Sequence, residues 1–167
     1  MGRIKAKTHL EKLGFSETDK KNSKHDIIQN WTCENIQKIL SETIMKDNPN
    51  PFKVLGAKWE HQIMHINGNY RMIVGFIDLF VGIKGKFYFK NSKEYVECTK
   101  DILIEVKTQI PSCGELIRQM RAYQSYENFE RRHLTEYLII ANDDRHEKIL
   151  NEQGFWFYKY KDPTQLF

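Results

Sequence analysis

Apolar residues recur along this chain with two different spacings, and these spacings divide it into helices and strands. Between Ser23 and residue 46, apolar residues including Trp31 recur every three or four positions, which predicts an amphipathic helix. Ser23, followed by Asp26 three residues later, predicts the N-cap of this helix. The asparagine- and proline-rich run 47–51 predicts its end.

Two strands and a tight turn are predicted next. Residues 58–66 largely alternate between polar and apolar, whereas residues 72–81 are almost continuously apolar, which predicts a strand in the centre of a sheet. Asn67-Gly68-Asn69 lies between them and indicates a hairpin turn. Residues 84–100 are polar, and the aromatic segments within them suggest an additional hairpin outside the core.

The second half of the chain predicts further strands and helices. Residues 102–108 contain four apolar residues, three of them β-branched, and read as a buried strand. Ser112 and Glu115 form a capping-box pattern at the start of a helix over 112–132. A strand over 136–141, a short helix over 144–152 and a strand over 155–158 complete the order of an α/β domain.

Three charged residues interrupt the apolar strands. Asp78 is the one charge in residues 72–81, and Glu105 and Lys107 lie two positions apart in the strand 102–108. Side chains two positions apart project from the same face of a strand. A buried charge is unfavourable unless it is paired or bound to a metal. The residues therefore indicate either a structural ion pair or a Mg²⁺ or Mn²⁺ site, because these cations take oxygen ligands from one or two carboxylates.

The order of these residues resembles a known family. Gly75-Phe76-Ile77-Asp78, then Glu105-Val106-Lys107, then Gln119-Met120-Arg121-Ala122-Tyr123 are similar to the D…ExK…QxxxY motifs of the PD-(D/E)xK nuclease superfamily, RecB-like branch. The resemblance covers about residues 24–141. It implies a restriction-endonuclease-like α/β fold, with a central mixed sheet flanked by helices in the order α-β-β-β-α-β, followed by a C-terminal helix and strand. The proline of the superfamily's name is an isoleucine here.

The resemblance also implies roles for the residues of these motifs. Asp78, Glu105 and the Val106 carbonyl would be metal ligands, and Lys107 would orient the attacking water and steady the phosphate. Gln119 and Tyr123, one helical turn apart, would both face the active site.

Further residues are candidates for metal binding or DNA contact, and each also has an ordinary structural explanation. Glu60 matches an acid that many relatives carry on the preceding strand, but it is also an ordinary exposed strand residue. His25 or Glu34 could supply a metal ligand from the first helix. Alternatively, His25 is an ordinary residue at the helix start and Glu34 is a solvated side chain. Arg118 and Arg121 could contact DNA, although a solvated basic helix face explains them equally well.

These residues predict a metal-dependent DNA nuclease with weak sequence specificity, and the resemblance to RecB-like nucleases implies a preference for ends or single-stranded DNA. By resemblance, small nucleases of this kind are typical of viruses and mobile elements, and a partner protein in replication, recombination or transposition would fit. A structure-specific endonuclease such as a Holliday-junction resolvase shares the D…ExK core, but such enzymes generally lack QxxxY. The alternative of another class is a binding module that holds nucleic acid on a degenerate nuclease fold without cutting it.

Composition and charge refine this interpretation. The 167 residues, 40% of them hydrophobic, suit one domain with a real core. Residues 1–24 hold seven Lys/Arg and three Asp/Glu, so this segment accounts for the whole net charge of +4. We expect a basic N-terminal arm over 1–22, suited to a polyanion, and a nuclease domain over 23–167. Three scattered cysteines and the lack of a visible signal peptide or apolar span predict a cytoplasmic protein.

Overall fold

A computed structural model describes residues 24–126 and 133–163 of the chain. The predicted basic arm, the predicted N-cap Ser23 and the predicted end of the helix over 112–132 lie outside the described residues. The elements, in chain order, are α2 (Lys24–Glu34), α3 (Ile36–Glu42), β1 (Phe52–Asn67), β2 (Tyr70–Phe89), β3 (Glu94–Lys107), α4 (Cys113–Tyr126), β4 (Thr135–Ala141), α5 (Glu147–Glu152) and β5 (Trp156–Lys159).

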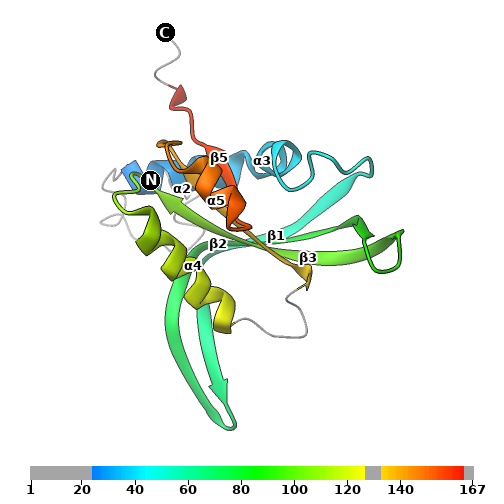
Figure 1. Cartoon of the computed structure of the whole chain (residues 1–167), viewed down its shortest axis with the longest axis horizontal. Coiled ribbons are helices and arrows are strands. Elements are labelled where there is room, and N and C mark those ends of the chain that lie inside the picture. Colours follow the sequence, from blue (N-terminus) through cyan, green and yellow to red (C-terminus); the bar gives the residue numbers. More distant parts are fainter. Residues whose placement is uncertain (1–23, 127–132, 164–167) are drawn as a thin grey trace, which may run out of the picture.

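The strands form one five-stranded mixed sheet in the order β1-β2-β3-β4-β5 (Figure 1). β1, β2 and β3 are antiparallel neighbours, and β3, β4 and β5 run parallel. The parallel pairs follow from the chain order, because α4 connects β3 to β4 and α5 connects β4 to β5. The α/β class and the mixed sheet flanked by helices are therefore confirmed.

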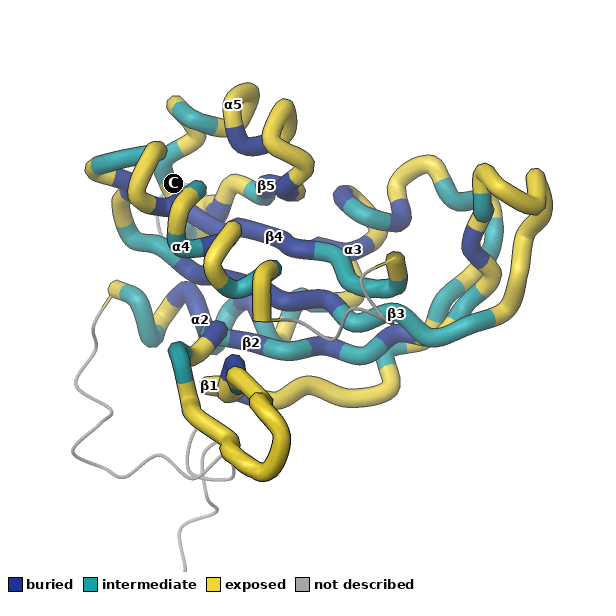
Figure 2. The backbone as a smooth tube through the Cα atoms, turned by 60° about the horizontal axis from the view of Figure 1, so that its bottom comes forward, coloured by how far each residue is buried: buried dark blue, intermediate teal, exposed yellow. Residues whose placement is uncertain are grey.

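The helices cover both faces of the sheet, and each face has its own hydrophobic cluster. On one face, Ile28 of α2 and Leu40 of α3 pack with alternate residues of the central strands, such as Ile104. On the other face, Met120 of α4 and Leu150 of α5 pack with the residues of opposite parity. Each fully buried side chain of this size contributes about 1.5–3 kcal/mol. The buried central strands are dark in Figure 2, and most of their side chains are withdrawn from solvent.

The prediction of one continuous helix from Ser23 to residue 46 is wrong in two respects. The helix is interrupted at Asn35, whose φ of −109° and ψ of 13° are not helical, and it ends at Glu42. The Asn35 side chain donates to the Trp31 carbonyl at 2.9 Å, and the same carbonyl accepts the Asn35 amide at 3.0 Å, so the side chain shares an acceptor with the backbone. The apolar spacing continues through this break, which is why the pattern alone did not reveal it.

The strands extend well beyond the predicted bounds. Residues 84–100 do not form a separate excursion, because β2 continues to Phe89 and β3 begins at Glu94. Phe87 pairs with Val96 and Tyr88 with Tyr95, as expected for a hairpin, but the pairing runs on from the core without a break. The hairpin turn at Gly68, where φ is +58°, lies where the sequence predicted it. Pairing with a neighbouring strand thus holds polar residues that have little strand propensity of their own.

The remaining elements are close to their predicted positions. Ser112 Oγ accepts a hydrogen bond from the Glu115 amide at 3.3 Å, which confirms the predicted N-cap of α4. α5 begins at Glu147 rather than 144, because Asp143 binds the Arg145 amide and guanidinium in a local turn. No helix in residues 24–126 and 133–163 has the length and apolar character of a membrane span.

Candidate active site

The candidate site lies where β2 and β3 separate. Their antiparallel ladder ends with Leu79 opposite Ile104, whereas β3 continues alongside β4 to Lys107. One residue beyond the ladder, the Asp78 carboxylate takes over the pairing: its Oδ2 accepts the backbone amide of Val106 at 2.7 Å. A side chain of β2 therefore satisfies a buried backbone donor of β3 that the diverging strand no longer reaches.

Glu105 is a buried carboxylate at the same point of strand separation, which we call the fork of the sheet. It is 3% exposed, and its Oε1 lies 2.6 Å from Lys107 Nζ and accepts from Gln119 Nε2 at 2.9 Å. Burial raises the pKa of Glu105, the charge of Asp78 raises it further, and Lys107 and Gln119 act in the opposite direction. Glu105 Oε2 is also buried and has no hydrogen-bond partner among residues 24–126 and 133–163. A charged oxygen without a partner in such a place is unfavourable unless something else binds it.

A chain of hydrogen bonds links Glu105 to α4. Gln119 Nε2 donates to Glu105 and also to the Tyr123 hydroxyl at 2.9 Å, and that hydroxyl donates to the Phe76 carbonyl at 3.0 Å. The predicted shared face of Gln119 and Tyr123 is therefore present. Burial raises the pKa of Tyr123, so its hydroxyl keeps the proton that it donates to Phe76.

Gly75 makes this contact possible, and sequence reasoning did not single it out for that role. A Cβ at this position would lie 2.8 Å from Cε1 of the Tyr123 ring, closer than carbon atoms approach. The glycine therefore lets the ring lie directly against β2. Its place in the strand before Asp78 was the available signal, because glycine within a strand marks a close approach of another group.

The first helix contacts the site through two side chains. His25 Nε2 lies 3.4 Å from Asp78 Oδ1, and Gln29 Nε2 donates to the same oxygen at 3.2 Å. The hydrogen bond to Asp78 raises the pKa of His25 above 6.5, although burial alone would lower it. The sequence prediction named His25 but missed Gln29. Their spacing of four residues, which places them on one helix face, was the signal.

Glu60 lies across from Asp78 in the register of β1 and β2, because Trp59 pairs with Leu79 and His61 with Ile77. Glu60 is exposed, and its φ of +47° is unusual for a residue with a side chain. Glu34 is exposed and accepts from Asn30 at 3.2 Å within α2. In the described part of the chain, no three His, Cys, Asp or Glu side chains converge into a ready-made metal cage. At the point where β2 and β3 separate, the carboxylates of Asp78 and Glu105 are available to bind a cation.

The two arginines of α4 differ in their surroundings. Arg121 donates to the Gln153 carbonyl at 2.7 Å and lies over the Phe155 ring at 4.8 Å, so it ties α4 to the end of α5. Arg118 is exposed, with its guanidinium near Gly114 in the first turn of α4. Both arginines are exposed, and Arg121 in addition holds α4 against the end of α5.

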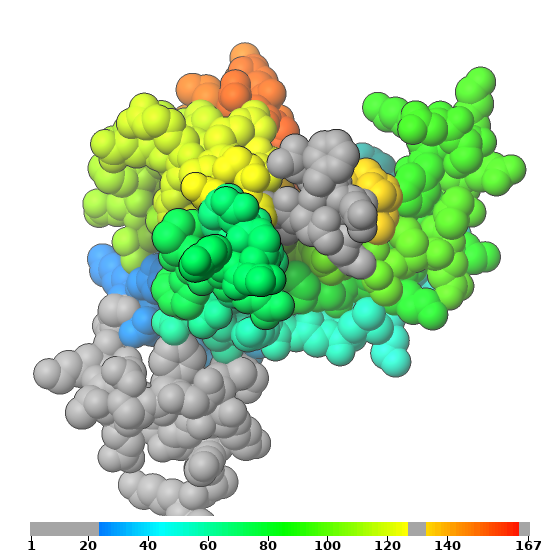
Figure 3. Space-filling model, turned by 90° about the horizontal axis from the view of Figure 1, so that it is seen from below, coloured from blue at the N-terminus to red at the C-terminus, as the bar shows by residue number. Residues whose placement is uncertain are grey.

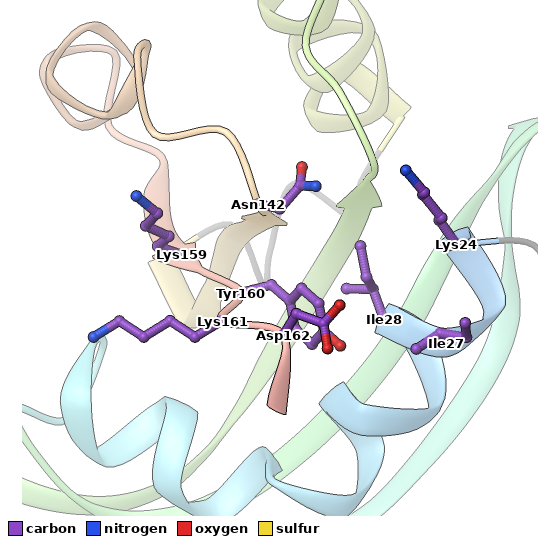
Figure 4. Close-up of a pocket in the computed structure, with 8 residues that line it drawn as sticks. All are labelled: Lys24, Ile27, Ile28, Asn142, Lys159, Tyr160, Lys161 and Asp162. Atoms are coloured by element: carbon purple, nitrogen blue, oxygen red, sulfur yellow. The ribbon is translucent and has the colours of Figure 1, made fainter. Parts of the chain in front are cut away.

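A basic pocket of about 520 Å³ lies beyond the N-terminus of α2 (Figure 4). Its walls include Lys24, which directly precedes His25, and Asn142, which directly follows β4. Lys159 and Lys161 lie on the opposite side, and Lys159 also binds Asp144 at 2.7 Å. Asp162 also lines the pocket, so the lining carries three lysines and one carboxylate and is only mildly basic.

The arrangement as a whole places two carboxylates, a lysine and a glutamine around one point of strand divergence. Such a set can hold a divalent cation and present an ammonium group to an anion bound beside it. Comparison of the chain with protein-family models, with curated proteins and with solved structures returned no match.

Proposed function

We propose that this protein is a Mg²⁺- or Mn²⁺-dependent nuclease with a restriction-endonuclease-like core, and that it hydrolyses phosphodiester bonds in DNA. The observation that carries the proposal is Glu105: a buried carboxylate beside Asp78, with one oxygen held by Lys107 and Gln119 and the other without a partner. The motif resemblance and the order of the elements around the fork support the same conclusion.

The residues at the fork fit a hard divalent cation. Mg²⁺ is ordinarily bound through one or two carboxylates, with water and phosphate oxygens as the other ligands. Asp78 and Glu105 would hold it, and the resemblance adds the carbonyl of Val106. A bound ion would act as a Lewis acid that stabilises negative charge on the phosphate.

The surrounding side chains would position these ligands and the substrate. Gln119 fixes Glu105, and Tyr123 fixes Gln119, so the carboxylate keeps one orientation. Lys107, whose side chain is 30% exposed, can turn its ammonium group toward a phosphate oxygen. Hydrolysis forms a bond between water oxygen and phosphorus and breaks a phosphorus–oxygen bond to the sugar. The attacking water loses a proton and the leaving oxygen gains one.

A non-cleaving nucleic-acid-binding module is the second candidate, and one observation favours it. Lys107 and Glu105 are only 2.6 Å apart, as in a structural ion pair. In that case the lysine would neutralise the carboxylate permanently and no cation would be needed. The unpartnered Oε2 of Glu105 argues for the nuclease, since a complete structural pair would satisfy both oxygens.

Metal binding and cleavage of one matched pair of variants separate the candidates. We expect wild type to bind Mn²⁺ in calorimetry and to cut linear DNA with Mn²⁺ but not with chelator. Glu105→Gln should lose both properties. Glu97→Gln, on the same strand and paired with Lys84 at 3.0 Å, should keep both. Wild-type protein that binds DNA but neither binds Mn²⁺ nor cleaves DNA would identify the binding module.

A further inference from the structure

The end of the β1–β2 hairpin extends beyond the rest of the sheet. We call residues 64–76 the arm; it is a different segment from the predicted basic N-terminal arm over 1–22. β3 pairs with β2 only from Leu79 onward, so the arm is a two-stranded ribbon, and no other described strand pairs with either of its edges. Figure 1 shows it leaving the body of the molecule beside α4, and in Figure 3 its end faces the viewer. Val74 opposes no residue of β1, and this bulge bends the ribbon where the arm begins.

The arm carries large apolar side chains that the described part of the chain leaves exposed. Tyr70 is 83% exposed at the tip, and the others are between 47% and 63% exposed: Ile66, Met72, Ile73 and Phe76. Such a cluster is unusual on a protein surface and indicates contact with a partner.

These side chains occupy both faces of the ribbon. Ile66 lies opposite Arg71 and shares a face with Ile73, whereas Tyr70 and Met72 project from the other face. A flat interface with a second protein would cover one face and leave the other exposed. Apolar groups on both faces suit a ribbon that enters between two surfaces.

The charges of the arm favour a polyanion. Residues 64–76 include Arg71 and His65 but no Asp or Glu. The arm therefore brings no carboxylate toward a phosphate backbone, and all 22 Asp and Glu residues lie elsewhere in the chain.

The base of the arm is joined to the candidate site. Phe76 lies two residues before Asp78, and its carbonyl accepts the Tyr123 hydroxyl that is linked through Gln119 to Glu105. His65 meets the Tyr126 ring of α4 at 5.4 Å, which steadies the arm along the same helix. The base of the arm therefore adjoins the carboxylates, and its tip at Tyr70 lies eight strand residues, or about 26 Å, from Asp78.

We propose that the arm is a wedge that enters DNA where duplex meets single strand and holds unstacked bases apart at a fixed distance from the active site. This rests on the proposed function, because it names the substrate of that site. Apolar side chains inserted between bases unstack them, and exposed aromatic rings stack on bases that have already separated. The preferred substrate is thus a forked or frayed duplex end rather than a continuous duplex.

The test measures unstacking and binding without cleavage. A forked DNA carries 2-aminopurine at the first pair of its duplex, and the full-length protein is added in chelator. We expect the fluorescence of 2-aminopurine to rise on binding of wild type and to stay low with Tyr70→Ala. By anisotropy, Tyr70→Ala should bind the fork about tenfold more weakly, the scale of one lost base stack.

Tyr88→Ala is the matched control, because Tyr88 is an exposed aromatic residue, 52% exposed, near the end of the other long hairpin. It should bind and unstack as wild type does. If Tyr70→Ala matches wild type in both measurements, the wedge is wrong. It is also wrong if sedimentation shows a dimer that Tyr70→Ala dissociates with unchanged fork affinity, since a second copy then covers the arm. Unstacking without cleavage in any metal would overturn the proposed nuclease and leave the wedge intact.

Discussion

The carboxylate of Asp78 accepts the amide hydrogen of Val106 at 2.7 Å, and this bond spans the point where β2 and β3 separate. The other oxygen of this carboxylate accepts a hydrogen bond from Gln29 of α2 and lies beside His25 of the same helix. Asp78 therefore has two duties: it completes the backbone pairing of a buried strand, and it supplies a charged oxygen to the fork. The two duties can be separated by substitution.

Asp78→Asn and Asp78→Ala should differ in stability but agree in activity. Asparagine keeps a carbonyl oxygen for the Val106 amide, whereas alanine leaves a buried donor without a partner, a loss of about 1–3 kcal/mol in the free energy of unfolding. Both remove a carboxylate from the proposed metal site. We expect chemical denaturation in chelator to rank wild type and Asp78→Asn close together, with Asp78→Ala well below. Neither variant should cut DNA, and cleavage by either at the wild-type rate would show that Asp78 is no ligand.

Glu105→Gln should stabilise the metal-free protein at neutral pH. Burial and the neighbouring Asp78 raise the pKa of Glu105 in the folded state above its ordinary value of 4.5. The contribution of Glu105 to the free energy of unfolding is therefore largest below pH 4.5, where the group is protonated. This contribution is lost as the pH rises through the raised folded-state pKa. A neutral glutamine lacks this loss. Melting curves in chelator at pH 4 and pH 7.5 should show the variant gaining over wild type only at the higher pH.

The sequence predicted the contacts that depend on one element alone. Strand parity placed Glu105 and Lys107 on one face, and they lie 2.6 Å apart. Helical spacing placed Gln119 and Tyr123 together, and they share a hydrogen bond. Both follow from fixed local geometry.

Contacts between elements were harder to foresee. Gln29 reaches Asp78 only because α2 crosses the sheet in one particular register, and no local pattern sets that register. The extra length of β2 likewise depends on its partner β3, since a polar segment with a paired neighbour stays extended. The fit of Gly75 against Tyr123 needs both the strand and α4 in place.

His25→Ala should weaken Mn²⁺ binding, because it removes a group that orients Asp78. Loss of such an outer partner typically lowers metal affinity by about 10- to 100-fold. Glu34→Gln, an exposed change on the same helix, is the matched control and should leave the affinity unchanged. Calorimetry with Mn²⁺ measures both. Equal affinities for wild type and His25→Ala would reduce His25 to a helix-start residue, and a loss in Glu34→Gln would instead identify Glu34 as the contributor from α2.

Gly75→Ala should reduce turnover without touching a charged group. The new Cβ would lie 2.8 Å from the Tyr123 ring, so the ring must move and its hydrogen bonds to Gln119 and Phe76 must lengthen. Such overpacking lowers stability by about 1–3 kcal/mol. Gly56→Ala on β1 is the control, because a Cβ there has nothing within 4 Å. Single-turnover cleavage with saturating Mn²⁺ should be slowed in Gly75→Ala and unchanged in Gly56→Ala. In the variant Tyr123→Ala the ring is already gone, so adding Gly75→Ala should then have little further effect. If the two changes slow cleavage independently, Gly75 does not act through Tyr123.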